Sequence, residues 1–182
     1  MNNKTDAIVL RLAPYSDKAH MLYLYTRSHG RMTYLVYGLH SAKKRAAKAL
    51  LEPMSLIRIE ADLQDNRSLG QLRECEAAYV PKQLLFDARR RCIALFIAEM
   101  VYRTVPHPLR DEELFAFLEQ TVRDLDACPD PQNAHLRFLT GYAAQLGYSS
   151  PAGDLHELMR FYTDNIPDFT PPNALSVLET VL

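Results

Sequence analysis

Four basic side chains fall within the six residues from Lys43 to Lys48. They follow a tyrosine-rich stretch, residues 31–37, that is typical of a strand. Cations beside exposed aromatic rings on a sheet suit a polyanion with flat bases, because cations neutralise phosphates while rings stack on bases. Two arginines at a short hairpin just before this strand extend the basic set. The candidate nucleic-acid contacts are Arg27, Arg31, Lys43, Lys44, Arg45, Lys48, Tyr34 and Tyr37.

Each of these contacts has a plainer interpretation. A short helix in the basic segment would put Lys44 and Lys48 on one face, which could simply be solvated. Successive residues of a strand point to opposite faces, so Tyr34 and Tyr37 cannot both meet the same ligand, and either ring could instead belong to the core or the surface. If four to six cations do contact phosphates, a log–log plot of single-strand affinity against salt should have a slope of about −3 to −4.

A second basic cluster is Arg89-Arg90-Arg91, which opens a long amphipathic segment in an otherwise acidic half. Cations near a helix start are disfavoured by the helix dipole. Either they form a solvated face, or they bind an acidic peptide together with apolar pockets of the same half. We take all three arginines as candidate partner contacts.

Catalytic and metal-binding patterns are missing from the sequence. Its six histidines are not spaced as metal ligands or as members of a catalytic triad, and no phosphate-cradling glycine loop is present. Cys75, Cys92 and Cys128 are too dispersed for a structural zinc site, which usually takes paired donors. We expect a protein that is not an enzyme and has no cofactor. Lacking an apolar run of membrane-spanning length and an apolar signal core, it is also expected to be cytoplasmic.

The first 80 residues are predicted to form β-structure. Five short strands are expected near 5–12, 20–26, 31–39, 53–61 and 69–77, with the basic segment as a short helix between the third and fourth. This is the element order of an OB-fold, which often binds oligonucleotides on its sheet face and loops. Order alone leaves an SH3-like barrel about equally possible.

Residues 81–182 are predicted to form helices near 84–104, 111–126, 133–146, 154–163 and 173–182, separated by proline- and glycine-containing breaks. The sequence thus predicts an α+β protein, with a five-stranded OB-fold β-barrel at 1–80 followed by an α-helical domain at 81–182. Charge divides at the same point. Residues 1–80 carry 12 basic and 8 acidic side chains, a net of +4, whereas residues 81–182 carry 9 and 14, a net of −5. Such asymmetry suggests a nucleic-acid-binding part joined to another.

Three passages resemble the RecO family of recombination mediators. Residues 8–17 are similar to its opening strand and "Y-S-E" turn, and residues 24–31 are similar to its "T-x-x-x-G" hairpin. The stretch from Gly38 through the basic run to Pro53 is similar to its "K-G-x-(basic)-S…L-x-P" region. A weaker similarity covers Leu136–Leu139 and Leu146–Tyr148. The order of these passages along the chain adds most of the weight.

The resemblance implies an OB-fold on a helical domain, with binding of single- and double-stranded DNA and strand annealing. It also implies two protein partners, a RecR-like protein and the C-terminal tail of single-strand-binding protein. The chain departs from the family at Tyr37, Leu39 and His40, which dilute the basic pattern. It also lacks the four zinc-binding cysteines that many members carry after the L-G-Y stretch. We therefore expect a compact member without that internal lobe.

Two other functions fit the same sequence features. The barrel could hold a peptide or a subunit as a protein-interaction adaptor, in which case the basic patch would be covered by the helical domain. It could also be an RNA-binding OB module of the translation machinery, which competition between DNA and RNA oligomers would reveal.

Overall fold

The computed structural model describes residues 4–39, 48–62, 69–106 and 109–182. The chain forms two compact units. The first unit contains Met1–Val80 together with Val105–Phe115, and the second contains Pro81–Thr104 together with Ala116–Leu182. The sequence places one boundary after residue 80, and the structure adds the segment Val105–Phe115 to the first unit.

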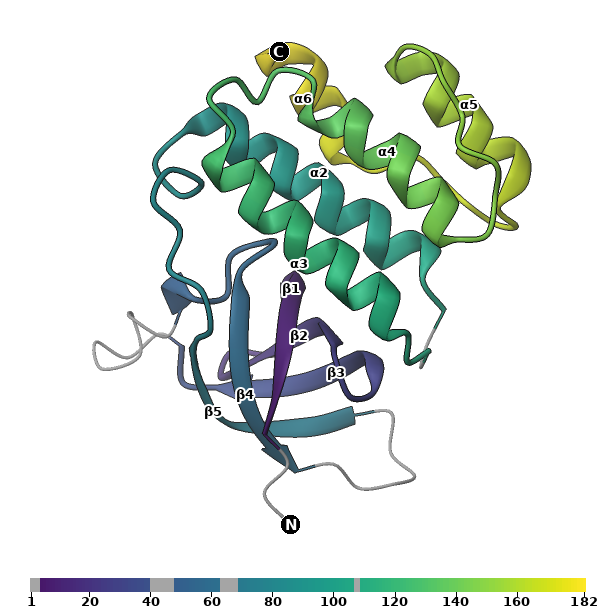
Figure 1. The fold of residues 1–182 in the computed structure, drawn as a ribbon. Helices are drawn as coiled ribbons and strands as arrows, with labels where there is room; N and C mark the ends of the chain where they lie inside the picture. Colours follow the sequence, from purple (N-terminus) through teal and green to yellow (C-terminus); the bar gives the residue numbers. More distant parts are fainter. Residues whose placement is uncertain (1–3, 40–47, 63–68, 107–108) are drawn as a thin grey trace. The chain divides into compact units, whose positions relative to one another are not determined.

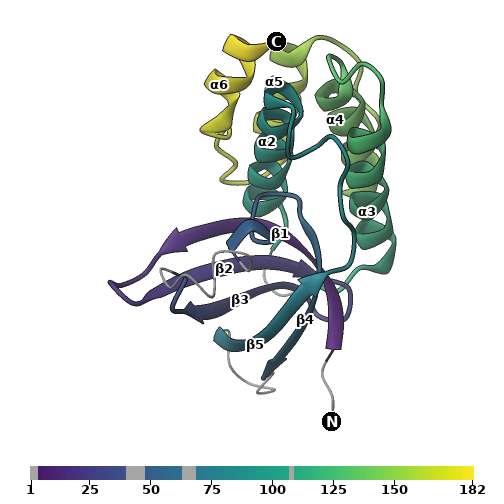
Figure 2. The same cartoon turned by 90° about the vertical axis from the view of Figure 1, so that its left-hand side faces the viewer.

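Five pairings between neighbouring strands close the first unit into a barrel, with strand order β1-β2-β3-β5-β4 (Figure 1). Figure 2 shows β5 lying between β3 and β4. The only parallel pairing among the described strands joins β3 to β5. The strands are β1 (Lys4–Pro14), β2 (Ala19–Thr26), β3 (Gly30–Tyr37), β4 (Leu56–Asp62) and β5 (Leu69–Ala77).

The barrel interior is filled by alternate residues of the strands, as their period of two requires. Leu22 and Leu24 of β2 meet Tyr34 and Val36 of β3 inside one apolar cluster. β4 begins at Leu56, three residues later than the pattern predicts. Met54 has a positive φ of 62°, and the Ser55 N–H donates to the Glu52 carbonyl, so these residues form a turn that ends at the strand.

Helices account for most of the second unit. Within it, α2 packs against α4 and α6, and α4 packs against α5. Rings of Phe138, Tyr142 and Tyr162 form a continuous aromatic core, with centroids 4.9 to 6.3 Å apart. The helices are α2 (Ala88–Thr104), α3 (Glu112–Ala127), α4 (Ala134–Gln145), α5 (Leu155–Asn165) and α6 (Ala174–Val181).

Acidic caps fix several helix starts, as their positions in the sequence suggest. Asp154 and Glu157 form a reciprocal capping box at α5, and the Asp111 carboxylate accepts from the Leu114 N–H at α3. The predicted start of α2 near residue 84 is wrong. Its true start, Ala88, follows from Asp87, whose carboxylate caps the helix by accepting from the Arg89 and Arg90 amides.

The prediction of an α+β fold is confirmed, with an N-terminal five-stranded barrel of OB-fold strand order followed by helices. No helix in the part of the chain that the structure describes has the length and apolar character needed to span a membrane.

Candidate nucleic-acid interface

The outer face of β2 and β3 is where an OB-fold commonly contacts oligonucleotides. Residues of these strands that do not enter the barrel core point outward. Tyr23 pairs with Thr33 and Met21 pairs with Leu35 along this face, and the Tyr23 hydroxyl donates to the Met21 sulfur over 3.6 Å. Midway along the strands, the face therefore presents the partly exposed ring of Tyr23 and some apolar surface from Met21 and Leu35.

The exposed end of this face combines two tyrosines. Tyr37 is 47% exposed and Tyr15, in the β1–β2 loop, is 62% exposed. Backbone bonds hold them together through Ala19, which pairs with Tyr37 and accepts from the Tyr15 N–H at 3.0 Å. The Gly38 N–H donates to the carbonyl of Lys18, an exposed cation of the same loop. This Tyr15–Tyr37 end thus combines aromatic surface with an exposed lysine, whose neighbour Asp17 in the loop is also exposed.

Tyr15 was not among the residues selected from the sequence. The signal was its place in the turn Pro14-Tyr15-Ser16-Asp17, since a large aromatic ring in a polar turn has no core to enter. The sequence does not indicate which residue lies beside Tyr15, because only the strand register brings residue 15 next to residue 37.

Tyr34 corrects the sequence prediction. The side chain is fully buried in the barrel core, and burial raises the pKa of its phenol to about 12. Its ring therefore has no face available for a base. The alternation argument is right that Tyr34 and Tyr37 lie on opposite faces, and it is Tyr37 that faces out.

The cations of the basic run can be placed only in part. Lys48 is exposed and is followed by Leu50 and Leu51, which pack against the barrel core. Lys43, Lys44 and Arg45 lie outside the described residues. Their predicted contact with phosphate stays a prediction.

The other end of the β2–β3 face is covered by the chain itself, by the described residues of the segment Val105–Phe115, which are 105–106 and 109–115. The Arg31 Nη1 donates to the Val105 carbonyl at 2.9 Å, and the Arg27 guanidinium lies 4.3 Å from the centroid of the Phe115 ring. The buried Tyr25 hydroxyl donates to the Leu109 and Asp111 carbonyls at 3.3 and 3.4 Å. Burial, followed by the charge of Asp111, raises the pKa of this phenol to about 12.

The two predicted arginines therefore hold a covering segment at the hairpin end of the sheet. They do not lie beside Tyr37, because β3 runs from Gly30 to Tyr37, which at the usual rise per residue is about 23 Å. Both arginines keep part of their surface in solvent, so each could still meet a phosphate at that end.

The three arginines at the start of α2 separate in the structure. Arg89 and Arg91 are exposed. Arg90 is buried, with Nη1 donating to the Leu125 carbonyl at 2.7 Å and Nη2 donating to the Gln83 side chain at 2.8 Å. The expectation that Arg90 binds a partner is corrected, because these contacts use its guanidinium to fix α2 to the end of α3.

Apolar surface for a peptide does occur on the second unit. A cavity of about 170 Å³ lies among α2, α3 and α4, and its apolar wall includes Ile97, Phe117 and Phe138. Arg137 and Asp124 line the same cavity. Arg137 is thus a cation at an apolar pocket that was not selected from the sequence.

Metal ligands do not gather in the described ranges, where no group of three or more His, Cys, Asp or Glu side chains could hold an ion. Cys75, Cys92 and Cys128 are free thiols.

Comparisons with known proteins cover both units of the chain. Residues 1–80 match the family model "Recombination protein O N terminal", and residues 85–151 match "Recombination protein O C terminal". The chain is 34% identical over 158 residues to the DNA repair protein RecO of Phocaeicola vulgatus and 33% identical over 157 residues to that of Bacteroides fragilis. Each of these matches covers 86% of the chain.

A third match, to the DNA repair protein RecO of Flavobacterium psychrophilum, is 27% identical and covers 98% of the chain and 74% of that relative. The chain spans 66% and 65% of the length of the first two relatives. Two family models in sequence order, together with relatives that align across both units, establish the relationship. The chain belongs to the RecO family.

Proposed function

We propose that this protein acts in DNA repair as a recombination mediator that binds single- and double-stranded DNA with little sequence preference. The observation that carries the proposal is the exposed Tyr15–Tyr37 end of the barrel, which precedes the basic run in a chain of the RecO family. The relatives it matches are named for DNA repair. In this function the chain promotes strand annealing and recombinase loading in the cytoplasm and makes or breaks no covalent bond.

The mechanism is electrostatic. Two DNA strands repel through their phosphates, and cations on the barrel reduce that repulsion when both strands are near it. Exposed tyrosines stack on unpaired bases of any identity, because every base has a flat face. Together these contacts hold a strand without reading its sequence and lower the barrier to pairing.

Fluorescence anisotropy with a labelled single-stranded oligonucleotide at low salt tests the proposal. We expect the variant Lys43→Glu, Lys44→Glu, Arg45→Glu to bind more weakly to all sequences alike, because phosphate contacts carry no base information. Absence of binding by the unchanged protein would refute the proposal, and a loss that depends on base sequence would indicate direct readout. Preference for RNA over DNA in competition would favour a translation-type OB module.

The tyrosines provide a matched test within one strand. Tyr37→Ala should weaken binding by about 1–3 kcal/mol per stacked base, and Tyr15→Ala should act similarly. Tyr34→Phe is the control, because it removes only a buried hydroxyl. Affinities for Y37A and Y15A that both equal that of Y34F would exclude stacking at this end.

The protein partners proposed are a RecR-like protein and the C-terminal tail of single-strand-binding protein. For the acidic, apolar tail, Arg89, Arg91 and Arg137 supply positive charge and the α2–α3–α4 cavity supplies apolar surface. Calorimetry with a tail peptide should show weaker binding by Arg137→Gln and by Arg89→Gln, Arg91→Gln than by the exposed control Arg160→Gln. Unchanged binding by both sets would place the tail elsewhere.

A further inference from the structure

A cationic pocket lies on the barrel at the opposite end of the sheet from Tyr37. It has a volume of about 310 Å³ and is built entirely from the first unit. Four cations line it, each from a different part of the chain: β1, the β2–β3 turn, β4 and the segment Val105–Phe115. They are Lys4, Arg27, Arg58 and Arg110.

Two carboxylates also line this pocket, and each is paired with an arginine. The Asp6 Oδ1 accepts from the Arg58 Nε at 2.9 Å, and the Glu112 Oε1 accepts from the Arg110 Nη2 at 2.7 Å. Each pair engages one guanidinium nitrogen and leaves the others of that group for a further acceptor. The residues that line the pocket, four cations and two carboxylates, have a formal net charge of +2, and the Lys4 amine also pairs with Glu60, which lies outside this lining. Hydroxyls of Thr5 and Ser28 add polar surface.

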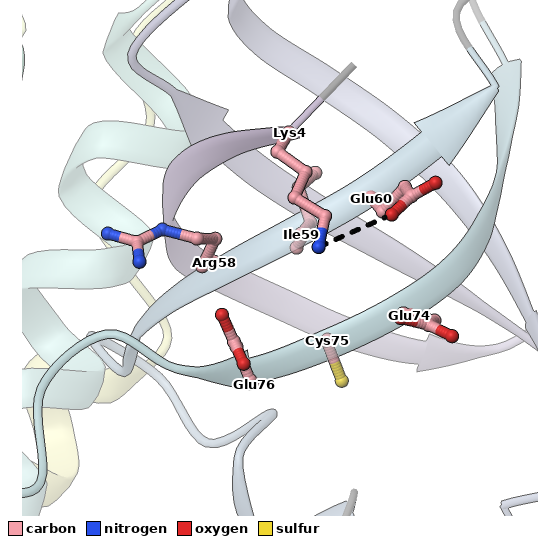
Figure 3. A pocket seen from close by; sticks show the side chains of 7 residues that line it. All are labelled: Lys4, Arg58, Ile59, Glu60, Glu74, Cys75 and Glu76. Carbon is pink, nitrogen blue, oxygen red and sulfur yellow. Dashed lines mark ion pairs between the residues drawn. The ribbon is translucent and has the colours of Figure 1, made fainter. Parts of the chain in front are cut away.

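A second pocket shares Lys4 and Arg58 but has the opposite character (Figure 3). Its other charged residues are Glu60, Glu74 and Glu76, on β4 and β5. Figure 3 shows the Lys4 amine reaching toward Glu60, where the N–O distance is 3.6 Å, and Arg58 turned away from Glu60 and Glu74. The lining of this second pocket has a formal net charge of −1, so we expect a polyanion to favour the cationic pocket over it.

We propose that the cationic pocket holds a phosphodiester group of a bound DNA strand, at a contact separate from the Tyr15–Tyr37 end. The assignment rests on the proposed function and adds a site to it. Arginine pairs with phosphate through its planar fork of donors, and here three arginines and a lysine converge from separate segments. The length of β3 then sets the spacing between the phosphate contact and the stacking contact on one strand.

The test is anisotropy with a single-stranded oligonucleotide and the full chain. Lys4→Gln, Arg110→Gln removes two exposed cations of the pocket, with side chains 51% and 60% exposed. At 0.1 M salt, loss of this one phosphate contact should weaken binding by about fivefold and reduce the magnitude of the log–log salt slope by about 0.7. Lys82→Gln, Arg160→Gln makes the same charge change at exposed sites on the second unit and should leave affinity unchanged.

A variant of opposite sign separates charge from damage to the fold. Glu112→Gln removes a carboxylate from the pocket and should strengthen binding by about twofold. Weakening by both K4Q/R110Q and E112Q would overturn the proposal, because a phosphate site responds to these changes in opposite directions.

Equal affinities for K4Q/R110Q and K82Q/R160Q would overturn the pocket alone and leave the proposed function intact. If the unchanged protein fails to bind the oligonucleotide, the pocket fails together with the proposed function.

Discussion

Asp126 fixes the first residues of the second unit through a single buried carboxylate. Its Oδ1 accepts from the Gln83 and Leu84 amides at 2.8 and 2.7 Å, and its Oδ2 accepts from the Lys82 amide at 2.9 Å. The side chain lies in the last turn of α3, more than 40 residues from these donors. One carboxylate thus accepts from three backbone amides, of which that of Leu84 belongs to a buried residue.

Replacement of Asp126 should therefore be strongly destabilising. Asp126→Asn converts a charged acceptor of three amides into a neutral group whose NH₂ faces donors, and we expect the free energy of unfolding to fall by about 1.5–3 kcal/mol. Asp124→Asn is the control on the same helix, because Asp124 is exposed and should change stability by about 0.5 kcal/mol or less. Urea denaturation followed by circular dichroism gives both values, and similar losses for the two variants would contradict a structural role for Asp126.

His135 is a second buried polar group in the second unit, and its effect depends on pH. Burial lowers the pKa of its imidazole below the usual 6.5, and the charge of Arg137 lowers it further, against a backbone hydrogen bond that raises it. The unfolded chain then binds a proton more readily than the folded one as the pH falls through 6.5. The stability that depends on neutral His135 is therefore fully present above this pH and is lost progressively as the pH falls below it.

Calorimetric Tm values between pH 8 and pH 5 test this sign. We expect Tm to fall over the lower part of the range and His135→Gln to flatten the dependence, because the group that takes up the proton is gone. His156 is exposed, so His156→Gln should retain the slope. A slope that survives H135Q unchanged would assign the proton uptake to another group.

At the scale of elements, local pattern predicts the existence and order of the five strands, although β4 begins three residues later than predicted. Alternation along residues 20–37 placed Tyr34 and Tyr37 on opposite faces, and the order of the five strands predicted the barrel. Long-range contacts decided what local pattern could not. The start of α2 moved to Ala88 because Asp87 caps it and a carboxylate far along the chain engages residues 82–84.

In the candidate site, too, local pattern and long-range contacts determine different features. Arg90 has the same local signal as Arg89 and Arg91, yet it is buried, since its hydrogen-bond partner Leu125 lies 35 positions away. Lys4, Arg58 and Arg110 stand alone in the sequence, and only barrel closure and the covering segment gather them. Single charges without a local cluster gave no signal from which such a pocket could be predicted.

At Gly30 the covering segment lies against the backbone of the barrel. The φ of Gly30 is +69°, and a Cβ there would lie 1.9 Å from the Leu109 carbonyl oxygen. Gly147 has a similar φ of +85°, but no atom would lie within 4 Å of its Cβ. Both glycines have a left-handed backbone, but only Gly30 has atoms of another segment close to the position of a Cβ.

Alanine substitution at both glycines separates these two effects. Gly147→Ala should lower the free energy of unfolding by about 1–2 kcal/mol, the cost of a left-handed backbone. Gly30→Ala should lower the free energy of unfolding by about 1–3 kcal/mol more than this, because the covering segment must be displaced. Urea denaturation measures both, and equal losses would show that the segment yields without cost.

For the whole molecule, the distribution of charge matters more to DNA binding than its sum. The net charge is −1, yet residues 1–80 carry +4. A polyanion within about 8 Å of the barrel at physiological salt responds mainly to the charges there, because more distant ones are screened. Binding should therefore depend on where a charge is changed.

Salt titrations of single-strand affinity with three single variants test this dependence. Lys48→Gln should reduce the magnitude of the log–log salt slope by about 0.7, because a phosphate contact is lost. Arg160→Gln changes the net charge equally and Glu179→Gln changes it oppositely, both at exposed positions on the second unit, and neither should alter the slope. Slopes that follow net charge across all three variants would mean that the strand is attracted by the molecule as a whole. A change confined to K48Q would place a phosphate contact at the end of the basic run.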